Sequence, residues 1–416
     1  LAVMNMAIGA GHAGVRAMCG TSGGGFALMT EAIGMAGMIE APVVVIAVQR
    51  GGPSTGIPTK TEQADLNQVY GASQGDYPRV IIAPTDTTDC YYTAVEAHNL
   101  AEKYQLPVTI ISDLLLSEHP ETIEPDALRH DVVIERGEMV SEWAEAESGQ
   151  FKRYAFTKSG VSPRALPGTE GAMYVAATDD HDEEGVVISD VFTTPPVRRK
   201  IQEKRMRKME AVLAELPPPR LEGPPDADVT LLAWGSTGGV IREAVALLAQ
   251  QGVRANHLQI KYLHPFHSKE VSEILSSCKR VICVECNYTG QFARHLRAET
   301  GFSVNELILK YDGEPFEPHH VVEQVQAILA GQPRSLDVTL DEAREIAYHY
   351  IRVHLADKVR PAKIEQEEGD SERLWVVEMV GRESGEQEGE LRIGAETGSI
   401  YSWELTKVMS AGASSD

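Results

Sequence analysis

The sequence is poor in cysteine, in cationic relative to anionic side chains, and in long apolar runs. Five cysteines among 416 residues do not provide a disulfide framework. Lysine and arginine number 38 against 61 aspartates and glutamates, and the resulting net charge of -23 would repel nucleic acid and anionic membranes. No apolar run reaches membrane-spanning length, and the first residues lack a signal-peptide pattern. We therefore expect a cytoplasmic protein that binds neither nucleic acid nor membrane.

What remains is the composition of an ordinary soluble globular protein. Hydrophobic residues make up 43% of the chain and charged residues 24%. A chain of 416 residues is long enough for two or three domains, each with its own core. A local cationic pocket would stand out against so acidic a background.

Hydrophobic patterning predicts strands that alternate with helices through the first part of the chain. The expected strands are at 14–18, 42–49, 79–83 and 108–112. The expected helices are at 1–11, 26–39, 61–70 and 86–104. This alternation favours a parallel, doubly wound α/β sheet, in which ligands usually bind near the carboxyl ends of the strands.

The strand expected at 42–49 runs directly into a loop that is rich in glycine, proline and hydroxyl groups. Arg50 opens this loop as a candidate anion-binding side chain, and Ser54 and Thr55 offer hydroxyls. Glycines that allow tight turns and prolines that stiffen the loop are Gly51, Gly52, Gly56, Pro53 and Pro58. Two interpretations are open: a site for a small acidic substrate, or a surface connection whose hydroxyls cap the following helix.

A second glycine-rich turn precedes the helix expected at 26–39. Thr21, Ser22 and Gly23 lie in it, and free backbone N–H groups at a helix start can hold an anion or a polar ring edge. The alternative is simple N-capping by Thr21 or Ser22, which the spacing alone favours.

Two charged segments and a proline-rich stretch follow. The acidic residues around His181, at 179–185, lack the ligand spacing of a calcium loop, so a solvated charge run is favoured over a metal site. The segment 198–216 is typical of an amphipathic basic helix, and we expect its cations to pack against the acidic protein. Prolines at 216–225 predict a stiff linker and a domain boundary.

A second α/β unit is expected after this linker, with strands at 228–234, 254–262, 280–285 and 306–310. The glycine turn at 235–239 lacks the spacing of a dinucleotide fingerprint. Cys278, Cys283 and Cys286 resemble part of an iron–sulfur pattern, but no fourth ligand is evident nearby, so a structural role is favoured.

The motifs at 20–29, 50–66 and 285–291 occur in an order that resembles the alpha subunit of the 2-oxoacid:ferredoxin oxidoreductases, with the 2-oxoglutarate type the most similar. The resemblance covers residues 1–331. It implies a thiamine-diphosphate pyrimidine-binding-like domain at 1–127, a connecting segment and linker at 128–225, and a domain at 226–332 that is similar to the transketolase C-terminal domain.

The resemblance also implies roles for individual residues. Arg50 and Thr55, with Ser54, would bind substrate, and Thr21, Ser22 and Gly23 would lie beside the thiamine ring. No residue is assigned as catalytic or as a metal ligand. Thiamine diphosphate with Mg²⁺ and a [4Fe–4S] cluster would be held mostly by a partner beta subunit. Ferredoxin, and a gamma subunit or domain, would be further partners.

The implied reaction is oxidative decarboxylation of 2-oxoglutarate, with coenzyme A taking the succinyl group and ferredoxin taking the electrons. Two alternatives stay open. One is another thiamine-dependent 2-oxoacid dehydrogenase or a transketolase-like subunit, which would differ in its acceptor. The other is a non-catalytic binding or regulatory subunit, which would be favoured if the folded chain bound no beta-type partner.

The two ends of the sequence depart from the family pattern. The chain starts inside the helix expected at 1–11 without an initiator methionine, so we expect a missing front end to the first domain. A helix at 337–353 and strands at 363–367, 375–380, 391–394 and 399–403 predict a small α+β module at 336–408. This module resembles PepSY-type domains, and packing or subunit contact is its expected role.

Overall fold

The computed structural model describes residues 1–144, 149–189, 193–332, 340–355, 358–369, 372–396 and 398–405. The chain forms two compact units, Leu1–Gln326 and Ala327–Asp416. The first unit contains two five-stranded sheets, and the second contains a four-stranded sheet. Across the described ranges, no helix combines the length and apolar character needed to cross a membrane.

The first sheet has the strand order β1-β2-β4-β3-β10. Its first four strands pair in parallel, and β10 pairs antiparallel with β3 at one edge. The strands are β1 (Met18–Thr21), β2 (Val43–Gln49), β4 (Pro107–Asp113), β3 (Val80–Ile82) and β10 (Tyr262–His264). The carboxyl ends of β1, β2 and β4 therefore meet at one edge of the sheet, as expected for a doubly wound fold.

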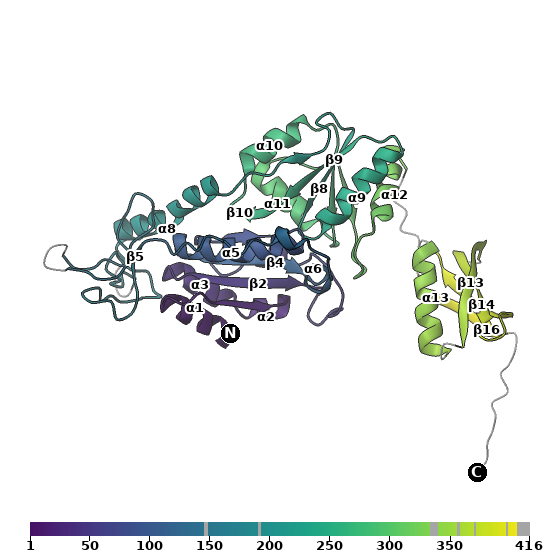
Figure 1. Cartoon of the computed structure of the whole chain (residues 1–416), viewed down its shortest axis with the longest axis horizontal. Helices are drawn as coiled ribbons and strands as arrows, with labels where there is room; N and C mark the ends of the chain where they lie inside the picture. The colour runs from purple at the N-terminus through teal and green to yellow at the C-terminus, as the bar shows by residue number, and fades with distance from the viewer. Residues whose placement is uncertain are drawn as a thin grey trace, which may run out of the picture. The chain divides into compact units, whose positions relative to one another are not determined.

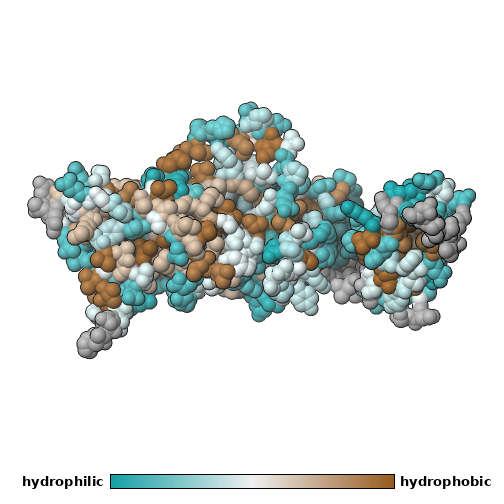
Figure 2. All heavy atoms as spheres, turned by 90° about the horizontal axis from the view of Figure 1, so that it is seen from below, coloured by the Kyte–Doolittle hydropathy of each residue, from teal (hydrophilic) through white to brown (hydrophobic). Residues whose placement is uncertain are grey.

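Helices cover both faces of this sheet (Figure 1). They include α1 (Ala2–His12), α3 (Thr30–Met38) and α5 (Thr87–Tyr104). Side chains alternate along a strand, so Val43 and Val45 pack in the core with α1 and α3, whereas Val44 packs with α5. Seen from below, the molecule shows patches of apolar side chains among polar ones (Figure 2), and Val3 and Met6 of α1 are exposed.

Three expected elements of this region were wrong in their bounds. The strand predicted at 14–18 lies instead at Met18–Thr21, because that segment pairs with β2 from Met18↔Val44 to Thr21↔Ala47. The single helix predicted at 26–39 is divided into α2 (Gly23–Ala27) and α3. The helix predicted at 61–70 is only α4 (Leu66–Tyr70), because the preceding backbone pairs elsewhere: Gln63 N donates to Cys286 O.

The second sheet has the order β12-β11-β8-β9-β7. All its pairs are parallel except β7 with β9. The strands are β12 (Glu306–Leu309), β11 (Val281–Glu285), β8 (Val229–Trp234), β9 (Ala255–Ile260) and β7 (Leu221–Glu222). The helices are α9 (Thr237–Gln250), α10 (Ser268–Ser277), α11 (Gln291–Thr300) and α12 (Pro318–Leu329). The predicted α/β fold class is therefore confirmed for this region as well.

The chain between the two sheets is mostly irregular until a long helix. It contains α6 (Leu114–Glu118), the 3-10 helix η1 (Pro125–Ala127), β5 (Met139–Val140) and β6 (Arg164–Ala165). It ends in α8 (Pro195–Glu215), which begins with two prolines, a favourable helix start because neither needs an N–H partner.

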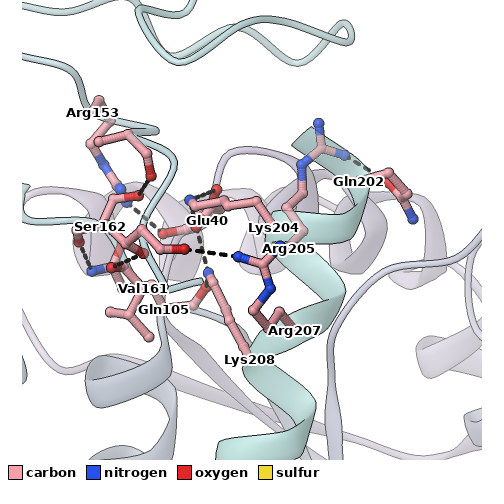
Figure 3. Close-up of polar contacts among 12 residues, drawn as sticks. Glu40, Gln105, Arg153, Val161, Ser162, Gln202, Lys204, Arg205, Arg207 and Lys208 are labelled. Carbon is pink, nitrogen blue, oxygen red and sulfur yellow. Dashed lines mark hydrogen bonds and ion pairs between the residues drawn. The ribbon is translucent and has the colours of Figure 1, made fainter. Parts of the chain in front are cut away.

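The cationic side chains of α8 pack against a buried carboxylate, as the sequence predicts. The Nζ atom of Lys204 lies 2.6 Å and 2.8 Å from the two carboxylate oxygens of Glu40, and Lys208 donates to the same carboxylate (Figure 3). Arg153 adds a hydrogen bond of 2.8 Å to the Glu40 carbonyl. The Glu40 side chain is fully buried, and we call these four residues the Glu40 cluster.

The acidic segment at 179–185 is not the solvated charge run that the sequence predicts. His181 is fully buried, with its ring centroid 4.1 Å from that of Tyr154. Asp180 pairs with Arg205 Nη2 at 2.6 Å and with Arg198 Nε at 3.0 Å. The reason lies in tertiary structure, because α8 brings both arginines to this segment.

The second unit is a helix packed on an antiparallel sheet of order β13-β14-β15-β16. Its elements are α13 (Leu340–His354), β13 (Val359–Glu368), β14 (Arg373–Gly381), β15 (Gln387–Gly394) and β16 (Ile400–Leu405). Ala343, Ala347 and Ile351 recur every four residues and pack with Val377 and Leu391. The predicted helix start at 337–339 and the predicted module ends at 336 and 406–408 lie outside the described residues.

Candidate functional site

Two neighbouring strand ends bring the predicted site residues together. The strands β1 and β2 pair in parallel with Thr21 opposite Ala47, and Arg50 follows the last residue of β2. The turn that contains Ser22 therefore lies beside the start of the Arg50 loop, which we define as residues 50–60. This is the carboxyl edge of the sheet, where ligands of α/β proteins usually bind.

Arg50 connects the two predicted motifs. Its Nε donates to Ser22 Oγ at 3.3 Å, and its Nη1 donates to the Thr55 carbonyl at 3.2 Å. Both acceptors are uncharged oxygens, and the Arg50 side chain is half-buried. Neither hydrogen bond uses a carboxylate, so the guanidinium can still bind an anion.

The Arg50 loop is closed on itself and exposed at its tip. Gly51 N donates to Lys60 O at 3.1 Å, and Ile57 N donates to Gly51 O at 3.0 Å. Gly56 has φ of +50°, and a Cβ there would lie 2.2 Å from the Gly51 oxygen, so only glycine fits.

Residues 52–60 are exposed, including Ser54 and Thr55 with their hydroxyl groups. Solvent therefore reaches the hydroxyls that the sequence assigns to substrate.

No side chain of the Thr21–Gly25 turn caps the start of α2, although the sequence spacing favours such a cap. Ser22 is the residue before α2, but its hydroxyl makes no capping hydrogen bond and accepts from Arg50. Thr21 Oγ1 lies over Gly25, where an added Cβ would be only 1.9 Å away. Gly24 is exposed and faces open space. The Ser22 hydroxyl and the open backbone of Gly24 together offer donors that fit the edge of a neutral heterocycle.

Asp65 is a site residue that the sequence analysis did not single out. Its backbone N donates to Gln49 Oε1 at 3.0 Å, and its carboxylate lies against Gly23, where an added Cβ would be 2.6 Å away. Burial raises the pKa of this carboxyl group, and the positive charge of Arg50 opposes the rise. The sequence pattern placed Asp65 inside the helix expected at 61–70 and so gave no signal for it.

Asp113 ends β4 beside Gln49 of β2 and is buried. One carboxylate oxygen accepts from Leu116 N at 3.0 Å and so caps α6. The other accepts from the Ser236 hydroxyl at 2.5 Å, in the turn after β8. Burial raises the pKa of Asp113, while the hydrogen bonds from Ser236 and Leu116 oppose that rise. Asp113 thus joins the two sheets.

The cysteines of the second sheet have the environment of structural residues. Cys283 and Cys286 are free and buried, and burial raises the pKa of both thiols. A thiol with a raised pKa is a poor nucleophile and a poor metal ligand. Within the described ranges, no three His, Cys, Asp or Glu side chains are placed to hold a metal ion.

Two family models match the α/β region, and the first places it in a thiamine-diphosphate-binding class of protein. Residues 1–194 match the model described as pyruvate flavodoxin/ferredoxin oxidoreductase, thiamine diP-bdg. Residues 227–321 match pyruvate:ferredoxin oxidoreductase core domain II.

Curated relatives then give the family. A 2-oxoacid:ferredoxin oxidoreductase 1 alpha subunit from Sulfurisphaera tokodaii is 38% identical over 80% of this chain and 52% of its own length. A 2-oxoglutarate synthase subunit KorA from Methanothermobacter marburgensis is 30% identical over 79% of this chain and 84% of its own. The chain belongs to the 2-oxoacid:ferredoxin oxidoreductase alpha subunit family. It spans about half the length of the first curated relatives that it matches.

A solved structure supports the same assignment. The 2-oxoglutarate:ferredoxin oxidoreductase from Magnetococcus marinus, with 2-oxoglutarate, coenzyme A and succinyl-CoA bound, matches with a TM-score of 0.70 and 36% identity. The match covers 78% of this chain and 55% of that one.

Proposed function

We propose that this chain is the alpha subunit of a complex that oxidatively decarboxylates 2-oxoglutarate, with coenzyme A accepting the succinyl group and ferredoxin accepting the electrons. The observation that carries the proposal is Arg50, a half-buried cation at parallel strand ends whose hydrogen-bond partners are neutral oxygens. The 2-oxoglutarate bound to the Magnetococcus marinus enzyme and the name of the Methanothermobacter relative support the choice of substrate.

In this proposal Arg50 binds a carboxylate of the substrate. A planar guanidinium can hold a carboxylate through two parallel N–H donors, which orients the substrate as well as attracting it. The exposed hydroxyls of Ser54 and Thr55 can each donate one further hydrogen bond. Lys60, the other cation of the loop, already pairs with Glu314, so Arg50 is the better placed of the two to receive an anion.

Thiamine diphosphate, when bound, supplies the electron sink that loss of carbon dioxide from a 2-oxoacid requires. The residues of this chain that would contact it are Thr21, Ser22 and Gly23. Of these, the Ser22 hydroxyl can donate to the edge of the ring, beside the open backbone of Gly24. In this proposal the diphosphate, Mg²⁺ and the [4Fe–4S] cluster are held mostly by a partner beta subunit.

The test is a coupled assay on the assembled complex. The chain, in its full-length gene context, is co-expressed with the neighbouring beta-subunit gene, and viologen reduction is followed with 2-oxoglutarate, thiamine diphosphate and coenzyme A. Reduction that requires coenzyme A supports the proposal. Transfer to lipoamide or to an aldose would instead support another thiamine-dependent class. No turnover of any 2-oxoacid by a well-assembled complex would point to a non-catalytic subunit.

For the C-terminal module we propose a packing or subunit-contact role, consistent with its PepSY-like pattern. Tyr401 and Trp403 on the edge strand β16 are exposed, and edge strands with exposed aromatic side chains are suited to contact another surface.

A further inference from the structure

The chain that returns from the Arg50 loop is attached to the second sheet by Gln63. This glutamine is buried, and its backbone N donates to Cys286 O at 2.6 Å. Its side-chain Oε1 accepts from Cys286 N at 3.1 Å, and its Nε2 donates to Trp234 O at 2.9 Å. Gln63 therefore bonds the carboxyl end of β8 and the first residue after β11.

Asn287 completes this attachment from the other side. Its Nδ2 donates to Gln63 O at 3.1 Å and to Glu285 Oε2 at 2.8 Å. Its Oδ1 accepts from Gly290 N at 2.7 Å. Glu285 is fully buried and also accepts from Phe292 N at the start of α11. Because its neighbours are fixed, Asn287 offers Gln63 a rigid partner.

A third contact supports the return end of the loop. Thr61 N donates to Gly313 O at 3.1 Å. Gly313 has φ of +86°, and a Cβ added there would lie 2.5 Å from Ile57 Cδ1 and 2.9 Å from Lys60 Cβ. Lys60 also pairs with Glu314. The loop therefore packs closely on the segment that follows β12.

We propose that Gln63 and Asn287 are positioning residues for substrate recognition, through which the second α/β sheet sets the place of the Arg50 loop. This inference rests on the proposed role of Arg50 in binding a substrate carboxylate. The exposed loop is held mainly at its two ends, by β2 at Arg50 and by Gln63 at the return. Loss of the Gln63 side-chain hydrogen bonds to Trp234 and Cys286 loosens the return end, and small displacements of a substrate-binding group are costly.

The first experiment separates positioning from general stability. In the assembled complex, Gln63→Met removes both side-chain hydrogen bonds and keeps most of the volume. We expect KM for 2-oxoglutarate to rise about tenfold while kcat changes less than about twofold, since binding and not chemistry is affected. Tyr262→Phe is the matched control, because it removes a hydrogen bond of 2.7 Å to Glu96 of α5 without contacting the loop. Its KM should stay unchanged.

Gly313→Ala is the second variant, in case Gln63→Met does not fold. An added methyl group would push directly on Ile57 and Lys60, so the same rise in KM is expected. Unchanged KM in both folded variants would overturn the inference.

Amide hydrogen exchange of residues 51–60 distinguishes this inference from the proposed function. If the wild-type complex turns over no 2-oxoacid, the function fails, yet faster exchange in Gln63→Met than in Tyr262→Phe would still support positioning of the loop. If the wild type is active, faster exchange with a raised KM supports the inference. Equal exchange in all three proteins, or faster exchange without a change in KM, contradicts it.

Discussion

The Glu40 cluster and the Arg50 loop both place cationic side chains at the edges of the first sheet, but the hydrogen-bond acceptors of these cations differ. In the cluster, the ammonium groups of Lys204 and Lys208 share one buried carboxylate, and none of the three side chains is more than 1% exposed. In the loop, Arg50 is half-buried and bonds to a hydroxyl and a carbonyl. A cation whose charge is already paired holds the fold together, whereas one with neutral partners can still bind an anion.

The difference is also visible in the protonation of the carboxyl groups. Burial opposes ionisation of Glu40, but the charges of Lys204, Lys208 and Arg153 outweigh it and hold its pKa well below its usual value. At the loop, burial raises the pKa of Asp65, and a single arginine only opposes the rise. The cations of the cluster therefore hold the Glu40 carboxylate in its charged form, although burial lowers the pKa of Lys204 to about 7, whereas the hydrogen-bond acceptors of Arg50 are both uncharged.

The largest expected effect is on stability. Glu40→Gln removes the carboxylate that offsets the burial of the Lys204 and Lys208 amino groups, and we expect the free energy of unfolding to fall by about 3–5 kcal/mol. Urea unfolding followed by circular dichroism measures this. The control is Asp228→Asn at an exposed ion pair with Lys279, which should change little. Equal stability of Glu40→Gln and wild type would contradict the structural role of the cluster.

Arg50→Ala should act on catalysis instead of stability. We expect kcat/KM for 2-oxoglutarate to fall by the equivalent of about 2–5 kcal/mol, the usual result of removing one member of a buried charge pair. Arg50→Lys should give an intermediate loss, because lysine keeps the charge but not the two parallel donors. Steady-state kinetics and a melting curve are measured together. The substrate assignment is wrong if kcat/KM stays at the wild-type value in Arg50→Ala.

The Glu40 cluster should also make the free energy of unfolding depend on pH in the acidic range. The pKa of Glu40 is lower in the folded than in the unfolded state, where its ordinary value is 4.5. Its contribution to stability is therefore complete above pH 4.5 and is lost as the pH falls further, by up to about 1.4 kcal/mol per pH unit. Urea unfolding between about pH 3 and pH 7 tests this in the wild type. A triple variant, Glu40→Gln with Lys204→Met and Lys208→Met, should lose this part of the acid dependence.

The smallest effect is expected at the contact between the two motifs. Ser22→Ala removes one hydrogen bond of 3.3 Å to Arg50, so we expect kcat/KM to fall by the equivalent of about 1 kcal/mol. Thr59→Ala removes an exposed hydroxyl from the same loop and is the control. A fall of the same size in both variants would show that the Ser22 contact has no special part in orienting Arg50.

Much of the fold was predictable from local pattern. The strands expected at 42–49 and 108–112 and the helix expected at 86–104 match β2, β4 and α5 within two residues. Long periodic segments of this kind show their burial directly in the sequence. The helix predicted at 61–70 failed over residues 61–65 because the backbone there makes hydrogen bonds outside a helix, such as Gln63 N to Cys286 O.

Most residues of the candidate site could be predicted from the sequence, but the contacts between them could not. Arg50 and the glycine turn at Thr21–Gly25 stand out as strand-end motifs, and the structure places them in contact. Asp65 was missed because the pattern placed it inside the helix expected at 61–70, where a single aspartate does not stand out. The acidic segment at 179–185 was misjudged as solvated, because nothing near it in the sequence shows that Arg205 covers Asp180.

The sequence by itself determined the α/β class of the protein, the position of Arg50 at the end of a strand, and the tight turn at Gly56. These depend on side-chain periodicity and backbone freedom over a few residues. Only the tertiary structure decided which charges are buried together and what holds the Arg50 loop. Glu40 and Lys204 are 164 positions apart, and Gln63 and Asn287 are 224 apart. Such contacts form only when packing of the whole unit brings distant segments together.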